Sequence, residues 1–378
     1  MSRRVDDIVL GLGGMGSAAA YHLARRGRRV LGLEQFDLLH GRGSSHGLTR
    51  IIRLAYHEDP AYVPLLRRAY ELWHELEAHA GERLLITTGS LEGGPSDGVI
   101  FRGAREAARV HQLDHELVSG PEVAQRFPGF APWGTQTAAV WQPDGGFLLA
   151  ERCVLAHVNL AIEHGAELRF RQRVLGWEPS GPGIVVRTGD ETIEAERLLV
   201  CAGPWAGKLI PALEAACRPE RQALAWILPR DPALFGVGRF PVFVLEDPKG
   251  LYYGFPSFDV PGVKLGLYHH LREAIDPDST DRSTTDEDDA VLRSFAARAL
   301  NGMDGPTTML TACIFTNSPD EHFIIGPLPG QEQVIVAAGF SGHGFKFCSV
   351  VGEVLADLAM RGGTAHQIGL FSPGRVLS

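Results

Sequence analysis

Cysteines are few in this sequence and long hydrophobic runs are absent. The cysteine count is odd, and no two cysteines have CxxC spacing: Cys153, Cys201, Cys217, Cys313 and Cys348. We therefore expect free thiols in a reducing cytoplasm, with no disulfide framework and no metal site. No apolar run reaches the roughly 18 residues that a membrane-spanning helix needs. The N-terminus leads directly into a glycine-rich motif without a small-residue cleavage site, so no signal peptide is expected either.

Positive charge is also scarce. The 378 residues include 36 basic and 45 acidic ones, a net charge of −9, which disfavours nucleic acid as the main partner. Only four of the 36 basic residues are lysines, namely Lys208, Lys249, Lys264 and Lys346. At roughly 150 residues per domain, the length suggests about two domains. A lysine inside a chemical motif is informative here, because the chain otherwise uses arginine for positive charge.

The first 34 residues have the pattern of a strand, a glycine turn, a helix and a second strand. The glycines are Gly11, Gly13 and Gly16, and Glu34 ends the second strand 18 positions after Gly16. This arrangement is typical of dinucleotide binding: the glycines allow a tight turn and close approach of a pyrophosphate to the helix N-terminus. Glu34 can accept hydrogen bonds from ribose hydroxyls and disfavours a 2′-phosphate. The alternative is a glycine-rich turn in an ordinary α/β unit.

The rest of the chain predicts an α/β fold with an α+β second domain. We expect a helix over residues 59–79, strands within 165–179 and 183–203, and alternating strands and turns over 220–275. The glycine turn at 201–205 follows a buried strand and is expected to contact the nucleotide. Thr285 followed by Asp288 indicates a helix start with a capping box.

These elements predict a Rossmann-type nucleotide-binding domain and a sheet-rich substrate domain. We assign residues 1–90, 149–217 and 320–378 to a discontinuous nucleotide-binding domain. Residues 91–148 and 218–319 form the substrate-binding domain.

Four separated segments carry a family resemblance. They are GRGSSHGLTRIIRLAY (41–56), YYGFPSF (252–258), CIFTNSPDEHFIIG (313–326) and GFSGHGFKF (339–347). In this order they resemble the monomeric sarcosine oxidases, and also the N-methyltryptophan and pipecolate oxidases, over nearly the whole chain. The resemblance implies an FAD-dependent amine oxidase of a small secondary amino acid. Sarcosine would give glycine and formaldehyde, while O₂ is reduced to H₂O₂.

The resemblance also implies how FAD is held. Cys313 would form a thioether with the 8α methyl group of FAD, although composition alone would make it a small buried hydrophobe. Together with the glycine motif, the resemblance assigns the cofactor contacts to Gly11, Gly13, Gly14, Met15, Gly16, Glu34, Gln35, Ser44, His46, Thr49, Arg50, Val174, Gly203, Trp205, Cys313, Gly342, Gly344, Phe345 and Lys346.

The substrate site follows from the same resemblance. Arg53 and Lys346 would bind the substrate carboxylate, for which a planar guanidinium is well shaped, with Tyr253, Gly342 and a histidine also in contact. Arg50 would lie beside the flavin. If residues 49–56 are helical, Arg50 and Arg53 share one face, and the alternative is a solvated helix surface.

Lys264 is the residue assigned to the oxygen reaction. It interrupts an apolar strand pattern, where a lone lysine could also serve as an edge-strand gatekeeper. The resemblance places it over the flavin, where a fixed cation would stabilise superoxide as it forms. The catalytic assignments are therefore Lys264, Arg50, Tyr253 and His269. Because one residue is inserted here relative to the family, His270 remains an alternative to His269.

Several readings stay open. Ser45 and Leu48 depart from the usual sarcosine oxidase pattern, and pipecolate, proline, N-methyltryptophan or a glycated amino acid could be the substrate. A nicotinamide-dependent dehydrogenase or a structural flavin-binding subunit are more distant alternatives. A hydrolase is not expected, because Gly339-x-Ser341-x-His343 does not complete a nucleophile elbow. The expected partners are a small amine and O₂, without nucleic acid or membrane, and the protein is expected to be a cytoplasmic monomer.

Overall fold

The computed structural model describes residues 3–278 and 281–377. Within this part of the chain the helices are α1 (Gly14–Ala24), α2 (Val63–Ala80), α3 (Val99–Val110), α4 (Gly120–Arg126), α5 (Ala150–Glu163), α6 (Ala206–Leu209), α7 (Asp286–Ala299) and α8 (Cys348–Arg361). None of these helices is long and apolar enough to cross a membrane.

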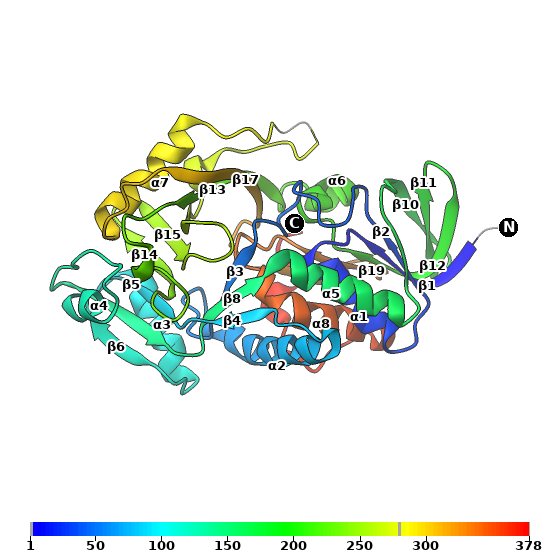
Figure 1. Ribbon diagram of the computed structural model, residues 1–378. Coiled ribbons are helices and arrows are strands. Elements are labelled where there is room, and N and C mark those ends of the chain that lie inside the picture. The colour runs from blue at the N-terminus through cyan, green and yellow to red at the C-terminus, as the bar shows by residue number, and fades with distance from the viewer. Residues whose placement is uncertain (1–2, 279–280, 378) are drawn as a thin grey trace.

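The first sheet is built on a parallel core in the order β9–β2–β1–β12, and β12 also pairs with β19. Its strands are β1 (Arg3–Leu10), β2 (Val30–Leu33), β9 (Glu167–Arg169), β10 (Val174–Ser180), β11 (Gly183–Thr188), β12 (Thr192–Val200), β18 (Ile324–Leu328) and β19 (Gln331–Ala338). The central strands are continuous apolar runs because both faces are covered. Val9 and Leu199 pack against the layer of α1, α2, α5 and α8, whereas Ile8 and Leu198 pack on the opposite face (Figure 1).

The second sheet is mostly antiparallel and has the order β17–β13–β16–β15–β14–β5–β7–β6. Its strands are β5 (Ser90–Pro95), β6 (Glu116–Ser119), β7 (Thr137–Gln142), β13 (Arg218–Ile227), β14 (Val242–Asp247), β15 (Gly250–Phe255), β16 (Val263–Leu267) and β17 (Thr307–Asn317). Side chains alternate along β15, so Tyr252 stacks on Phe295 of α7 at 4.0 Å while Tyr253 faces the other way. The capping box of Thr285 and Asp288 begins α7, as the sequence predicts.

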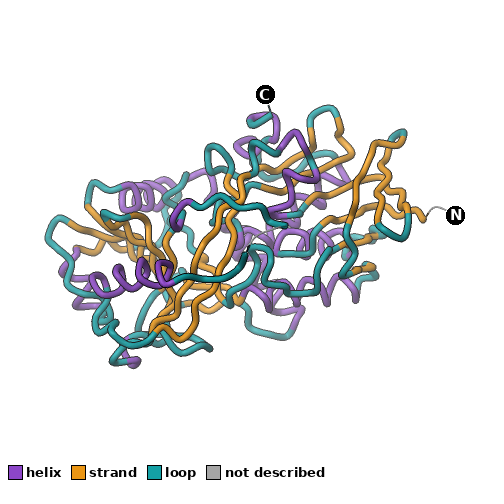
Figure 2. Tube along the Cα trace, turned by 90° about the horizontal axis from the view of Figure 1, so that it is seen from above, coloured by secondary structure: helices purple, strands orange, loops and turns teal. Residues whose placement is uncertain are grey.

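A small third sheet lies between the two large ones. It contains β3 (Thr49–Ile52), β4 (Leu85–Thr87) and β8 (Gly146–Leu149). The strands of the second sheet lie toward one end of the molecule and the β1–β2–β12 region toward the other, near the N-terminus (Figure 1), and the view from above shows strands at both ends (Figure 2). The α/β fold class is therefore confirmed. The helix predicted over 59–79 is also confirmed: α2 covers most of it and follows a 3₁₀ turn at Pro60–Tyr62.

Candidate active site

The glycine turn joins β1, α1 and the end of β12 at van der Waals contact. Gly11 has φ +85°, and a Cβ there would lie 2.5 Å from the Cys201 carbonyl oxygen. A Cβ on Gly16 would lie 1.8 Å from the Gly11 carbonyl oxygen. Only glycine fits these two positions, which lets the start of α1 lie close against the turn.

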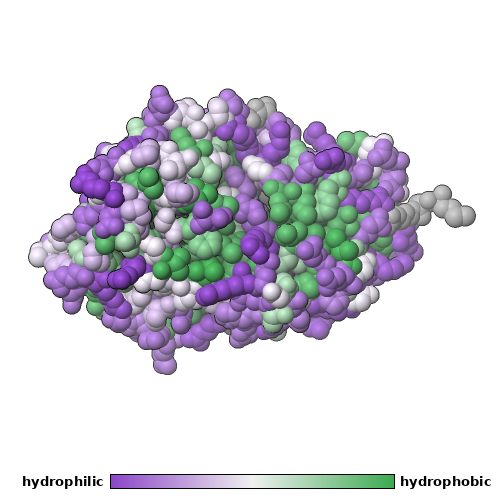
Figure 3. Space-filling model, viewed as in Figure 1, coloured by the Kyte–Doolittle hydropathy of each residue, from purple (hydrophilic) through white to green (hydrophobic). Residues whose placement is uncertain are grey.

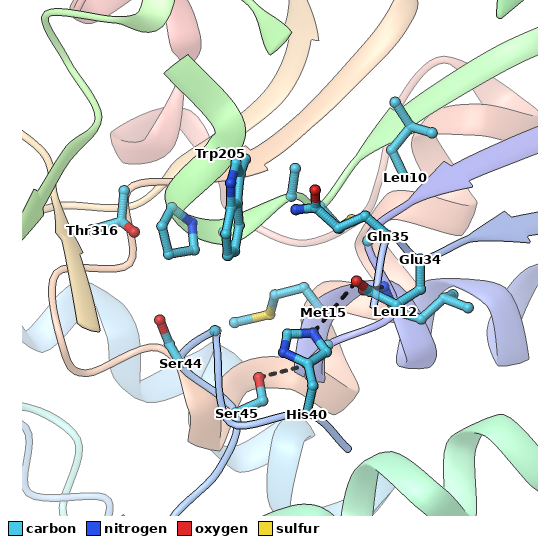
Figure 4. Close-up of a pocket in the computed structure, with 18 of the residues that line it drawn as sticks. Leu10, Leu12, Met15, Glu34, Gln35, His40, Ser44, Ser45, Trp205 and Thr316 are labelled. Carbon is cyan, nitrogen blue, oxygen red and sulfur yellow. Dashed lines mark hydrogen bonds and ion pairs between the residues drawn. The ribbon is translucent and has the colours of Figure 1, made fainter. Parts of the chain in front are cut away.

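A cavity of about 300 Å³ opens at this turn. Figure 4 shows Trp205 and Met15 pointing toward each other across it, with Ser44 and Ser45 on a neighbouring loop. The buried Glu34 carboxylate accepts hydrogen bonds from the backbone N–H groups of Leu12 (3.0 Å) and Phe36 (3.1 Å). We call this space the nucleotide cavity. It is lined by the assigned residues Gly11, Gly13, Gly14, Met15, Glu34, Gln35, Ser44, Arg50, Val174, Gly203, Trp205, Gly342, Gly344 and Phe345.

The mouth of the nucleotide cavity carries both apolar and charged side chains, the charged ones being Asp37, Arg173 and Lys208. Leu175 and Leu39 line the cavity with 67% and 37% of their surface exposed. On the face seen in Figure 3, apolar side chains gather in the region between α5 and α6. The exposed side chains of Leu39 and Leu175 lie in the same cavity as the Glu34 carboxylate. Such apolar side chains suit a flat heterocyclic ring.

A second cavity of about 360 Å³ adjoins the first. Arg50, Phe315, Gly342 and Phe345 line both cavities, so the two spaces meet at these residues. We call the second space the catalytic cavity. It also contains the assigned residues Thr49, Arg53, Tyr253, Lys264, Cys313 and Lys346.

Cys313 lies on β17 in a cationic environment. The Arg50 guanidinium donates to the carbonyl oxygens of Thr49 (2.8 Å) and Ser44 (3.0 Å) and lies 3.7 Å from the Cys313 sulfur. Burial raises the pKa of the Cys313 thiol, but His46 and Arg50 outweigh it and lower the pKa to about 6. The surroundings of Cys313 therefore favour its thiolate form, whereas burial raises the pKa of the other four thiols.

The Lys264 ammonium is almost fully buried and fully hydrogen-bonded. It donates to the carbonyl oxygens of Gly47 and Thr49, both at 2.7 Å, and to the Thr49 hydroxyl at 3.0 Å. The Phe255 ring centroid lies 4.4 Å away. Burial and the charge of Arg50 hold the pKa of Lys264 well below its usual range. Lys264 lies on β16 in the interior of the second sheet, so it is not an edge-strand gatekeeper.

Arg53 and Lys346 form a second cationic group in the catalytic cavity. One Arg53 Nη atom lies 3.1 Å from the Glu58 carboxylate, and its Nε lies 3.3 Å from Glu92. Lys346 Nζ donates to the His343 carbonyl oxygen at 2.7 Å. Burial and the charge of Arg53 lower the pKa of Lys346 to about 7, so an arriving carboxylate would favour its charged form.

Some sequence predictions are wrong. Residues 49–52 form a strand rather than a helix, so Arg50 and Arg53 do not share a helix face. His269 does not line either cavity; its ring bonds to Glu220 (2.9 Å) and Glu321 (3.1 Å).

The alternative histidine is also displaced from the cavity. His270 is buried against Asp288 at 2.8 Å, and Tyr268 is the member of this run that lines the catalytic cavity. The backbone has positive φ at His269, Leu271 and Arg272, and neither histidine lines a cavity at this turn.

Two other assigned residues act beside the cavities rather than in them. Gly16 packs α1 on the turn, and His46 lies against the Cys313 thiol. The sequence prediction missed Tyr268, Phe315, Glu58, His343 and Glu92 as residues in or next to the catalytic cavity. A signal existed for Glu92, because it is a lone carboxylate in an otherwise uncharged strand segment.

The chain is similar to known proteins over nearly its whole length. Residues 6–358 match the family model "FAD dependent oxidoreductase". The chain is 42% identical to monomeric sarcosine oxidase of Streptomyces avermitilis, covering 100% of this chain and 99% of that protein. It is 34% identical to N-methyl-L-tryptophan oxidase of Salmonella dublin, covering 94% and 95%. Among solved structures, NikD, "an unusual amino acid oxidase essential for nikkomycin biosynthesis", superposes with TM-score 0.85 at 26% identity and 98% coverage of both chains.

The charged surroundings of Cys313 predict an acidic thiol. In protein prepared without a cofactor, the thiolate absorbance near 240 nm should titrate with an apparent pKa of about 6. His46→Gln should raise this pKa toward the ordinary thiol value, because it removes the first of the two groups that favour the thiolate. Cys217→Ser serves as the control and should leave the titration unchanged. A Cys313 pKa unaffected by His46→Gln would contradict this account.

Proposed function

The chain belongs to the FAD dependent oxidoreductase family, and from this premise we propose that it oxidises a small secondary amino acid, most favourably sarcosine. Sarcosine would yield glycine and formaldehyde, with O₂ reduced to H₂O₂. One observation carries the proposal: the catalytic cavity adjoins the nucleotide cavity and contains two cations suited to a carboxylate, Arg53 and Lys346, and a separate buried ammonium, Lys264. Relatives that are 40–42% identical over nearly their full lengths are named monomeric sarcosine oxidase.

The residues present fit FAD. Gly11, Gly13 and Gly14 line the nucleotide cavity at the start of α1, which suits a pyrophosphate, and the Glu34 carboxylate suits ribose hydroxyls. A flavin ring would then lie where the two cavities meet, beside Arg50 and Phe345. A flavin bound there would accept two electrons from the substrate C–H bond next to nitrogen and would transfer them to O₂.

Cys313 is the proposed attachment point. Its lowered pKa provides the thiolate that a new carbon–sulfur bond requires. The sulfur would replace one hydrogen of the 8α methyl group. Forming this bond would release two protons, one from the thiol and one from the methyl group, and two electrons, which would be balanced by the reduction of one O₂ to H₂O₂. Arg50 and His46 would hold the sulfur in its anionic form until the bond is made.

The substrate carboxylate is proposed to pair with Arg53 and Lys346, and Tyr253 would donate a hydrogen bond from its hydroxyl. This pose points the amine toward the junction of the cavities. The wall formed by Ile51, Val244 and Leu251 is apolar, which suits a carbon chain or ring. This wall, with Tyr268 in place of a histidine, makes a cyclic secondary amino acid such as pipecolate or proline the second candidate substrate.

The body built on the second sheet is proposed as the substrate domain, with the remaining segments binding FAD. Its strands come from residues 90–142 and 218–317, close to the ranges that the sequence predicts. The name of the relatives supports a monomer. Five cysteines without a disulfide support a cytoplasmic location.

The substrate proposal predicts peroxide formation with a secondary amine. Purified protein should be yellow and should form H₂O₂ when given sarcosine, pipecolate, proline or N-methyltryptophan, with sarcosine showing the highest kcat/KM. Glycine, a primary amine, is the matched negative control. A colourless protein that binds NADH, or no turnover of any secondary amine in the panel, would sink the oxidase proposal.

The position of Lys264 predicts a selective defect in the oxygen reaction. Lys264→Met should slow reoxidation of the reduced flavin by O₂ roughly 10²-fold or more, because it removes a buried cation at the site of developing superoxide. Anaerobic reduction by substrate should fall much less. Stopped-flow absorbance measures both half-reactions, and Lys249→Met, at an exposed position outside both cavities, is the control. Equal slowing of both half-reactions would contradict the assigned role.

A further inference from the structure

Glu92 is a fully buried carboxylate beneath the catalytic cavity. It lies on β5, between β14 and β7, and its partners in register on those strands are Val244 and Val140. Carboxylates are rarely buried to this extent unless they are paired. The charged partner within reach is Arg53, whose Nε lies 3.3 Å from Glu92 Oε1.

Different side chains contact different nitrogen atoms of the Arg53 guanidinium. Glu92 faces Nε. Glu58 lies 3.1 and 3.2 Å from Nη2 with its two oxygens, and His57 Nδ1 lies 2.8 Å from the same atom. Nη1, Nε and both Glu92 oxygens are buried and have no hydrogen-bond partner among the described residues, so Glu92 acts on Arg53 as an ion pair at 3.3 Å and not through a hydrogen bond. A guanidinium can present one edge to a structural partner and still bind a carboxylate bidentately through its two Nη atoms.

Two further polar side chains lie on the same face of the sheet as Glu92. Ser90 is two residues away on β5, and Gln142 is paired with Ser90 in register. The Gln142 side-chain oxygen accepts hydrogen bonds from the backbone N–H groups of Leu54 (2.8 Å) and Ala55 (3.0 Å). This face of the sheet therefore fixes the backbone just after Arg53 as well as its side chain.

We propose that Glu92 is a positioning residue for substrate binding. Its negative charge keeps the Nε side of Arg53 in place, so that Nη1 and Nη2 face the substrate carboxylate when that carboxylate displaces Glu58. This inference rests on the proposed function, in which Arg53 binds that carboxylate. Without Glu92, Arg53 would be paired with Glu58 alone, and Glu58 competes with the substrate for the same Nη atoms.

The hold of Glu92 on Arg53 depends on pH. Burial raises the pKa of Glu92 to about 7, although the charge of Arg53 opposes this. The other groups that act on Glu92 are Ser90 on its own strand, Glu58, Lys346 and Tyr70 of α2. Above this pKa Glu92 is charged and holds Arg53, and below it the carboxyl is neutral and the hold weakens.

Glu92→Gln keeps the shape of the side chain and removes its charge. With sarcosine as the probe, KM should rise about tenfold at pH 8.5, while kcat changes less than about twofold. At pH 5.5 the KM values of the two enzymes should converge, because Glu92 is then neutral in the parent protein. Asp7→Asn is the control: Asp7 is equally buried and paired with Arg28 at 2.7 Å, but lies outside both cavities, and should leave KM unchanged.

The competition by Glu58 supplies a second test. In the double variant Glu58→Gln/Glu92→Gln the competing carboxylate is gone, so KM at pH 8.5 should return to within about threefold of the parent value. An unchanged KM in Glu92→Gln, or a KM ratio that is the same at both pH values, would overturn the proposal. If Glu92→Gln does not fold, Glu92→Asp replaces it. Its KM ratio to the parent should also grow between pH 5.5 and 8.5, and a ratio independent of pH overturns the proposal.

Binding of acetate separates this inference from the proposed function. Calorimetric titration of the flavin-loaded protein with acetate requires no turnover, and Glu92→Gln should weaken acetate binding about tenfold at pH 8.5. If this weakening is found but no secondary amine is oxidised, the proposed substrate class fails and the role of Glu92 stands. If amines are oxidised but acetate binding and KM do not depend on Glu92, the inference fails alone.

Discussion

The buried ammonium of Lys264 fixes the position of the elements around the catalytic cavity. Its three hydrogen bonds all go to Gly47 and Thr49, at the start of β3, whereas Lys264 itself lies on β16 of the second sheet. A buried ammonium must satisfy its donors, so β3 cannot move away from β16 without a large cost. Because β3 carries Arg50 and leads directly into Arg53, this contact also sets where the thiol and the carboxylate site can lie.

The charges around the catalytic cavity fall into two groups with different partners. Arg50 and Lys264 contact carbonyl oxygens, a hydroxyl and the Cys313 sulfur. Arg53 is paired instead with the carboxylates of Glu58 and Glu92. No carboxylate neutralises Arg50 or Lys264 among these contacts, so their positive charge can stabilise negative charge that develops during the reaction. The charge of Arg53 is neutralised by Glu58 and Glu92 until an anionic ligand competes for it. This separation suits an amino acid whose carboxylate and reacting carbon lie a few bonds apart.

The sequence predicts the parts of this site that depend on local pattern. The glycine turn, Glu34 and the turn at 201–205 are short-range signals, and all three line the nucleotide cavity. The strand at 49–52 is too short for periodicity to separate it from a helix. Tyr268 could not be distinguished from its histidine neighbours, because the turn with positive φ at His269, Leu271 and Arg272 decides which side chain faces the cavity, and the sequence pattern does not reveal that turn. The pairing of Glu92 with Arg53 joins a residue of β5 to one that directly follows β3, which sequence spacing does not reveal.

The account depends on one flavin spanning both cavities, with its ring between Cys313 and Lys264. Peptide mapping of the flavin-loaded protein by mass spectrometry tests this claim most directly. The account predicts that the peptide containing Cys313 carries the mass of one FAD less two hydrogens, and that the peptides of the other four cysteines carry none. Flavin released completely on denaturation, or found on another peptide, would contradict it.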